Sequence, residues 1–336
     1  MKRIMSCAPV ALVALVVLMG FVGCSSAPQG WLADYEEGQQ LASKKGKDML
    51  LFFSSEDTDG VSTQLKTNIF DTSAFIDAAS KDYVLVHLDY SDSRMAAVQV
   101  GEDATEEQKK VAEAAMPQLE KDIATAMNFS VAGGTMPVML LTTPQGYVYG
   151  TIPYDAAVTT PEQFLTVLAD NKENGDKLKS LAKAVDSSTG VAKLKAIDEL
   201  YEATDPAYSY LLSDLYGMGP ELDPNNESGL RGKYAMLDAY AKATEALFTG
   251  DAAVAIQAML APVEDGFCSD VEKQELLYQA AYFCSLIGDS ANMFTYLNQA
   301  LECAPESGEM ASSIKKTIDA YNRANENAGV TAEGME

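Results

Sequence analysis

Residues 47–57 read Lys-Asp-Met-Leu-Leu-Phe-Phe-Ser-Ser-Glu-Asp, and the apolar run at their centre, Met49 to Phe53, decides the fold of this part of the chain. A continuous apolar run of this length is typical of a strand that is covered on both faces. Tyr83 to Asp89 predicts the next buried strand. Helical patterns precede and separate the two runs, at residues 31–45, 60–68 and 73–80. Helices that alternate with buried strands predict an α/β domain.

The chain beyond the second strand predicts a long helix and then a hairpin. Residues 102–128 have a charged helical pattern, which we expect to be interrupted at Pro117 and to place Ala112, Ala115, Leu119, Ile123 and Met127 on one side. Val138 to Thr142 and Tyr147 to Thr151 are separated by Pro144-Gln145-Gly146, a turn sequence that predicts a β-hairpin. Thr160-Pro161-Glu162 begins a last helix that runs to about Asn171, because proline and an acidic residue are favourable in a first turn.

This order of strand, helix, strand, hairpin and helix is the thioredoxin layout. Particular residues resemble secreted thioredoxin-like domains of the DUF255 and thioredoxin-7 type, and the resemblance covers residues 31–172. It implies a central mixed sheet flanked by helices. The landmarks that carry it are Trp31, residues 47–57, Asn68-Ile69-Phe70, Phe75, residues 83–89 and Thr135-Met136-Pro137.

In the thioredoxin-like family the first central strand leads into Trp-Cys-x-x-Cys. Here Thr58 is followed by Asp59, Gly60, Val61 and Ser62, so Asp59 and Ser62 occupy the two cysteine positions. Thiol–disulfide exchange needs a thiolate nucleophile and a second thiol that resolves the mixed disulfide. We therefore expect no catalytic residue here, and Asp59 to act as a helix cap.

The resemblance also gives a role to a second segment, Thr135-Met136-Pro137. Pro137 matches the cis-proline that faces the active site in the family. In redox-inactive relatives this loop often remains part of a peptide-contact surface, which implies a binding role here. His87 lies in an apolar strand. A histidine that is hydrogen-bonded within the sheet is a simpler interpretation of this residue than a catalytic histidine.

Strand patterns end near residue 172, and residues 176–325 have an all-helical pattern. Gly250-Asp251 and Gly288-Asp289 each separate two helical runs. The second unit resembles the tetratricopeptide (TPR) pattern through Leu277, Ala281, Cys284, Gly288, Leu297, Ala300 and Pro305. The first unit matches less well, because Pro262 is expected to end its second helix early. A TPR-like array and generic helical hairpins both remain open. We expect residues 217–229 to form a loop and Ile314 to Tyr321 to cap the stack.

The first 23 residues have the layout of a secretory signal, with Lys2 and Arg3 followed by an apolar run from Ile4 to Met19. Phe21-Val22-Gly23-Cys24 resembles the lipobox of bacterial lipoproteins, with Phe21 where leucine is usual. The resemblance implies that Cys24 carries lipid, including palmitate, and anchors the chain to a membrane of the cell envelope. An ordinary signal peptide and an uncleaved anchor are the alternatives.

Composition excludes several functions. The 336 residues include 49 acidic and 24 basic side chains, a net charge of −25 that disfavours nucleic acid as a partner. A single histidine and 5 cysteines make zinc, haem or another cofactor site improbable, so we expect no metal and no cofactor. Beyond Cys7 and Cys24, the remaining thiols are Cys268, Cys284 and Cys303. Buried free cysteines are one interpretation and a Cys284–Cys303 disulfide is the other.

Five segments follow from these patterns: a lipoprotein signal peptide (1–23), a lipidated linker (24–30), a thioredoxin-like domain (31–172), a helical-hairpin domain (176–325) and an acidic tail (326–336). We expect a membrane-anchored lipoprotein of the bacterial envelope, facing the periplasm or the cell surface. Its expected role is a non-enzymatic binding or scaffolding module for an envelope protein or peptide. The alternatives are a thiol oxidoreductase or peroxidase-like enzyme that uses the C-terminal cysteines, and a structural lipoprotein without a specific partner.

Overall fold

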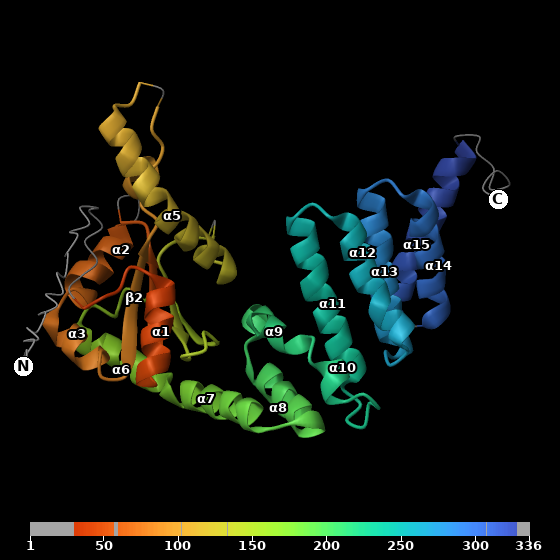
Figure 1. Ribbon diagram of the computed structural model, residues 1–336, viewed down its shortest axis with the longest axis horizontal. Helices are drawn as coiled ribbons and strands as arrows, with labels where there is room; N and C mark the ends of the chain where they lie inside the picture. The colour runs from red at the N-terminus through yellow and green to blue at the C-terminus, as the bar shows by residue number, and fades with distance from the viewer. Residues whose placement is uncertain (1–29, 57–59, 102, 133, 307, 328–336) are drawn as a thin grey trace, which may run out of the picture.

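A computed structural model describes residues 30–56, 60–101, 103–132, 134–306 and 308–327 (Figure 1). These residues are mostly helical and contain one small sheet. The sheet and the helices around it occupy one end of the molecule, and helices α11 to α15 occupy the other. The predicted signal, Cys24, Asp59 and the tail from residue 328 lie outside the described residues.

The sheet has four strands in the order β2-β1-β3-β4. Strand β1 (Asp48–Ser54) pairs in parallel with β2 (Tyr83–Asp89) and antiparallel with β3 (Val138–Thr142), which pairs antiparallel with β4 (Val148–Ile152). Every residue of β1 is buried, which confirms the prediction of a strand covered on both faces. The sheet is therefore mixed, with the two apolar runs in its centre and at one edge.

Helices cover both faces of the sheet. Phe52, Leu85 and Tyr149 point to one face, which packs against α2 (Gly60–Leu65), the π-helical turn η1 (Lys66–Phe70), α3 (Ser73–Ala79) and α6 (Pro161–Asp170). Leu51 and Leu140 point to the other face, which is covered by α1 (Tyr35–Lys45) and by residues 126–131. The helix starts are capped by side-chain oxygens of Asp34, Thr72 and Thr160.

The segment between β2 and β3 differs from the prediction. A short helix, α4 (Asp92–Ala96), precedes α5 (Glu106–Asn128), and α5 passes through Pro117 without interruption. Its buried residues are Ala112, Leu119, Asp122, Thr125 and Ala126. Ile123 and Met127 are exposed, so the predicted apolar side was partly wrong. Proline removes only one hydrogen bond of a helical ladder, and a helix of 23 residues retains the others.

The chain has no loop at residues 172–176, where the two predicted domains meet. Asn171 ends α6 and directly precedes α7 (Lys172–Ser187), which packs against β4. Gly175 permits this approach, because a Cβ atom there would lie 2.8 Å from Cζ of Tyr149. The sheet core continues through Leu178 into α8 (Gly190–Ala203) and reaches Tyr234. The ranges 31–172 and 176–325 stay predictions, and the first helix after that junction belongs to the sheet core.

The remaining helices form a stack of hairpins. After α8 come a 3₁₀ turn, η2 (Pro206–Leu212), and two short helices, α9 (Ser213–Tyr216) and α10 (Gly219–Leu222), the second of which lies within the predicted loop. Then follow α11 (Arg231–Phe248), α12 (Ala252–Asp265), α13 (Asp270–Leu286), α14 (Ser290–Cys303) and α15 (Gly308–Asn327). Helix α12 continues beyond Pro262, contrary to the prediction, while Ile314 of α15 is buried against the stack as expected.

Candidate functional site

The two segments that were predicted to form a site meet at one end of the sheet. Gly60, Val61 and Ser62 open α2, which follows the carboxyl end of β1. Thr135, Met136 and Pro137 directly precede β3, whose first residue, Val138, pairs with Phe53 near the end of β1. The Met136–Pro137 peptide bond is cis. Asp59, the other position aligned with a cysteine, lies outside the described residues.

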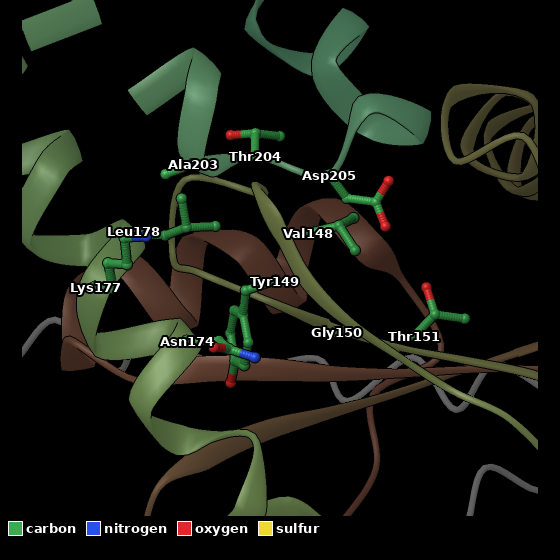
Figure 2. Close-up of a pocket in the computed structure, with 10 residues that line it drawn as sticks. All are labelled: Val148, Tyr149, Gly150, Thr151, Asn174, Lys177, Leu178, Ala203, Thr204 and Asp205. Carbon is green, nitrogen blue, oxygen red and sulfur yellow. The ribbon is translucent and has the colours of Figure 1, made fainter. Parts of the chain in front are cut away.

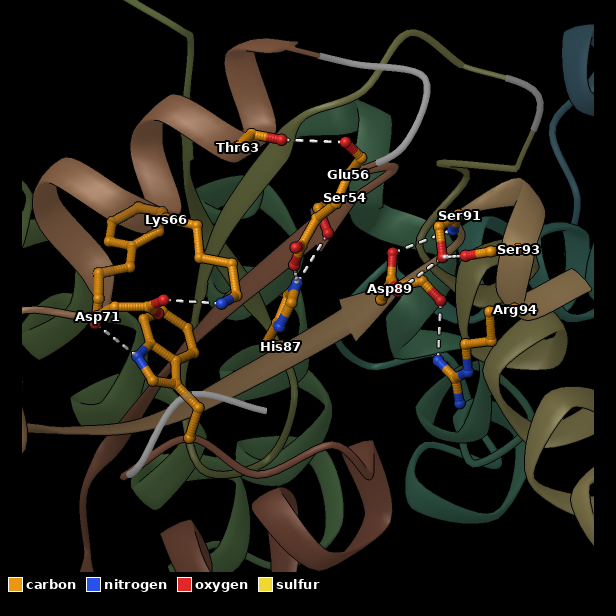
Figure 3. A network of polar contacts seen from close by, with 12 residues as sticks. Ser54, Glu56, Thr63, Lys66, Asp71, His87, Asp89, Ser91, Ser93 and Arg94 are labelled. Atoms are coloured by element: carbon orange, nitrogen blue, oxygen red, sulfur yellow. Dashed lines mark hydrogen bonds and ion pairs between the residues drawn. The ribbon is translucent and has the colours of Figure 1, made fainter. Parts of the chain in front are cut away.

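Ser62 cannot act as a surface nucleophile in this structure, because the residue is fully buried. Gly60 is exposed and Val61 is half-buried. Thr63 of the same helix donates a hydrogen bond from its hydroxyl to the carbonyl oxygen of Glu56 at 3.0 Å, which ties α2 to the chain that leaves β1 (Figure 3). At the second aligned position the structure therefore has a buried hydroxyl group in place of a thiol.

His87 lies beside this end of β1 but is enclosed (Figure 3). Its Nε2 is 2.7 Å from Oγ of Ser54 and 3.5 Å from Oε1 of Glu56. Burial lowers the pKa of His87 to about 4, although the charge of Asp89 acts in the opposite direction. Both contacts involve the same ring nitrogen and Ser54 is fully buried, so these groups do not form a nucleophile–base–acid relay. The interpretation of His87 as a hydrogen-bonded sheet histidine is confirmed.

A second polar cluster fastens α5 to the end of β2. Arg94 donates to the carbonyl oxygen of Asp89 at 2.8 Å and pairs with the buried carboxylate of Asp122. Gln118 also donates to Asp122, at 3.0 Å. Burial raises the pKa of Asp122, and the neighbouring Arg94 opposes that shift. Because the charge is paired and its oxygens are hydrogen-bonded, the cluster acts as a structural anchor.

The opposite end of β1 carries a polar cluster that the sequence did not reveal. The Asp48 carboxylate accepts hydrogen bonds from the Tyr149 hydroxyl at 3.0 Å and from Nζ of Lys179 at 3.1 Å. Burial raises the pKa of Asp48, and Lys179 and Tyr149 act against that rise. The only sequence signal was a carboxylate at the first position of a buried strand. Its partners follow 101 and 131 residues later, so no local pattern predicts them.

Two of the pockets in the described part of the chain are lined in part by strand residues. The larger, of about 300 Å³, lies between β4, α7 and residues 203–205, and none of the predicted site residues lines it (Figure 2). The smaller, of about 150 Å³, is predominantly apolar and lies near the start of β3. Its lining includes Leu65, Met139, Ile152, Val158 and Phe164. Met139 is two residues from Pro137 in sequence, but Thr135, Met136 and Pro137 do not line the pocket.

The three remaining thiols lie in or beside the hairpin helices, and all are free. Cys268 and Cys284 are buried. Burial raises the pKa of Cys268 to about 11 and also raises the pKa values of Cys284 and Cys303. A thiol with a raised pKa is mostly protonated at neutral pH and is a poor nucleophile. Among the described residues, no group of histidine, cysteine and carboxylate side chains has an arrangement suited to a metal ion.

Comparisons with known proteins address parts of the chain. Residues 230–327, from just before α11 to the end of α15, match the family TP_0391_C, described as an uncharacterised protein C-terminal domain. A solved structure titled "DsbH Oxidoreductase" is similar at 15% identity and a TM-score of 0.32, over 43% of this chain and 89% of its own. No curated protein matches. Within the described residues, none of the helices combines the length and hydrophobicity that a membrane span requires.

Proposed function

We propose that the protein is a lipid-anchored envelope protein whose thioredoxin-like domain has no thiol chemistry and serves to bind or scaffold another protein. The observation that carries the proposal is the absence of an accessible thiol at the site. Ser62 is buried where the family has a cysteine, and Asp59 occupies the other cysteine position. The domain would thus keep the surface that surrounds the active site in the family but would not catalyse thiol–disulfide exchange.

The sheet supports the thioredoxin-like interpretation. Its order β2-β1-β3-β4, with β1 and β2 parallel and the last two strands antiparallel, agrees with the layout that the resemblance implies. The segments Gly60–Ser62 and Thr135–Pro137 lie at the same end of that sheet, and Leu65 and Met139, a few residues after each segment, line an apolar pocket of about 150 Å³. A pocket of that size accommodates one apolar side chain of a bound peptide.

The oxidoreductase alternative requires a reactive thiol among Cys268, Cys284 and Cys303. All three have pKa values raised by burial, and none belongs to the elements that form the sheet end. An insulin-reduction assay on the full-length protein tests the distinction. We expect no turnover above background, and the same result for a variant with all three cysteines changed to serine. Turnover that this variant loses would establish the oxidoreductase and refute the proposal.

Crosslinking in cells followed by mass spectrometry tests the binding role. We expect one partner at stoichiometric yield, and its absence would favour a purely structural lipoprotein. The anchor has its own test, which is incorporation of labelled palmitate. Labelling should disappear in Cys24→Ala and persist in Cys7→Ala, because, of these two cysteines, only Cys24 would remain after signal removal. Equal labelling of both variants would contradict lipidation at Cys24.

A further inference from the structure

Exposed large apolar side chains gather where α11 and α13 end. Phe248 is 76% exposed, Leu286 is 55% exposed and Tyr282 is 52% exposed. Leu247 and Ile287, their neighbours in sequence, are also exposed. These five residues are called the apolar patch below. Soluble proteins rarely expose several large apolar side chains together unless the surface has a binding role.

A hydrogen bond between the two helices shows that α11 and α13 are neighbours. The Tyr240 hydroxyl of α11 donates to Glu275 of α13 at 2.9 Å. The chain reverses twice between them, so α11 and α13 run in the same direction (Figure 1). Seven residues are about two helical turns. Two turns beyond Tyr240 and Glu275 are Leu247 and Tyr282, which therefore lie at the same level, and Leu286 lies one turn further.

The patch is not part of the helical core. The core side of the same helices is filled by small residues, among them Ala243, Ala246 and Ala280, which are all buried. The turns beside the patch carry Asp251 and Asp289, and α11 contributes Glu245. Hydrogen bonds from Asn292 lower the pKa of Asp289, which keeps that carboxylate ionised. Lys242, the basic residue nearest to Leu247 along α11, is paired with Asp238 at 2.7 Å.

We infer that the apolar patch is the docking surface for an amphipathic helix of a partner protein, with lysine or arginine residues beside its apolar stripe. The inference rests on the proposed binding function and names its surface and partner chemistry. Two parallel helices present a groove that a third helix can occupy. The patch extends over about one turn of α13 and across to the end of α11, which suits apolar anchors on adjacent turns of the bound helix, at i and i+3 or i+4. Its acidic border complements basic residues and repels the anionic headgroups of a bilayer.

The test uses full-length protein in lipid nanodiscs and a labelled leucine/lysine peptide of roughly 18 residues with leucine in helical periodicity. We expect saturable binding, measured by fluorescence anisotropy. A peptide of the same composition with scrambled leucine positions should bind more weakly. The double variant Phe248→Ser/Leu286→Ser should weaken the peptide more than about 10-fold. Val111→Ser is the control, because Val111 is exposed to the same extent as Leu286 but lies on α5.

Glu245→Gln provides a second measurement. It should weaken the peptide by roughly 2-fold and reduce the salt dependence of binding, because rim charges contribute screened attraction. Equal binding of both peptides, or binding unchanged by the double variant, would overturn the inference. If nanodiscs that carry the parent protein associate in pairs and those that carry the double variant do not, the patch binds a second copy of this chain. This result would also overturn the inference. If crosslinking in cells finds a partner that the double variant still binds, the inference fails while the proposed function stands.

Discussion

The core around the sheet and the core of helices α11 to α15 are filled by different side chains. Nearly all of the largest fully buried side chains belong to the sheet core, including Phe52, Phe70, Phe75 and Phe164. The buried residues of the core between α11, α12 and α13 include five alanines and one aromatic residue, Phe283. Aromatic rings stabilise the first core through the volume that they fill. Small residues stabilise the second because they let helix backbones approach closely.

Removal of a buried ring should be the most damaging change in the sheet core. The centroid of the Phe70 ring lies 4.9 Å from the ring centroids of both Phe52 and Phe164. The backbone carbonyl oxygen of Phe70 accepts a hydrogen bond from Nε1 of Trp31. We expect Phe70→Ala to lower the free energy of unfolding by about 3 to 5 kcal/mol, because it leaves a cavity. Denaturant unfolding followed by Trp31 fluorescence measures this, since Trp31 is the single tryptophan and is buried there.

Phe248→Ala is the matched control, because Phe248 is 76% exposed at the end of α11. Its effect on the free energy of unfolding should stay within about 0.5 kcal/mol. Comparable losses from the two phenylalanines would show that burial of the Phe70 ring does not account for the stability that it adds to the sheet core.

Acid should destabilise the sheet core more than the helical core, because the single histidine of the chain lies in the sheet core. The pKa of His87 is lowered from 6.5 to about 4, mainly by burial, with Lys66 and Arg94 adding to the shift and Asp89 opposing it. Between those pH values the unfolded chain binds a proton that the folded chain does not. Stability therefore falls as pH falls through this window, by roughly 3 kcal/mol in total from this group.

His87→Gln removes this contribution while keeping a polar side chain at the position. The variant should lose less stability than the parent protein between pH 6.5 and about 4, as measured by Trp31 fluorescence in denaturant. Parallel pH profiles for the two proteins would show that His87 takes up its proton in the folded state as readily as in the unfolded state.

Local patterns predicted the strands well and the face of α5 poorly, for a physical reason. The apolar character of residues 49–53 and 83–89 is enough to predict that these strands are buried. Strand β2 begins and ends at the same residues as the second run. Asp122 is buried because Arg94 pairs with it, and that partner lies on another helix. A pattern of apolar residues cannot include such a carboxylate, so it assigned exposed Ile123 and Met127 to the buried side.

The candidate site also has parts that the sequence could predict and parts that it could not. The segments Gly60–Ser62 and Thr135–Pro137 follow or precede strands that the sequence defines, so their meeting at one sheet end was predictable. The Asp48–Tyr149–Lys179 cluster was not, because it depends on how closely α7 approaches β4 through Gly175. Proline was also weighted too strongly, since α5 and α12 both contain one without ending there.

Enlarging a buried alanine is the counterpart, in the helical core, of removing a ring from the sheet core. Ala280 of α13 is fully buried in the core that α13 shares with α12, so a leucine there forces the helices apart. We expect Ala280→Leu to cost about 1 to 3 kcal/mol of stability, measured by far-UV circular dichroism in denaturant. Ala261→Leu is the control, because Ala261 is exposed on α12, and it should change stability by less than about 0.5 kcal/mol.

The same experiment reports whether the two cores unfold separately. Helix α11 contributes Tyr234 to the sheet core and Ala243 to the helical core, so it is the element that joins them. Most of the helical core lies C-terminal to α11 in the chain. Ala280→Leu should therefore lower the unfolding midpoint measured by circular dichroism and leave the unfolding midpoint measured by Trp31 fluorescence unchanged. An equal shift of both midpoints would mean that α11 couples the cores into one cooperative unit, and the contrast between them would then be one of composition alone.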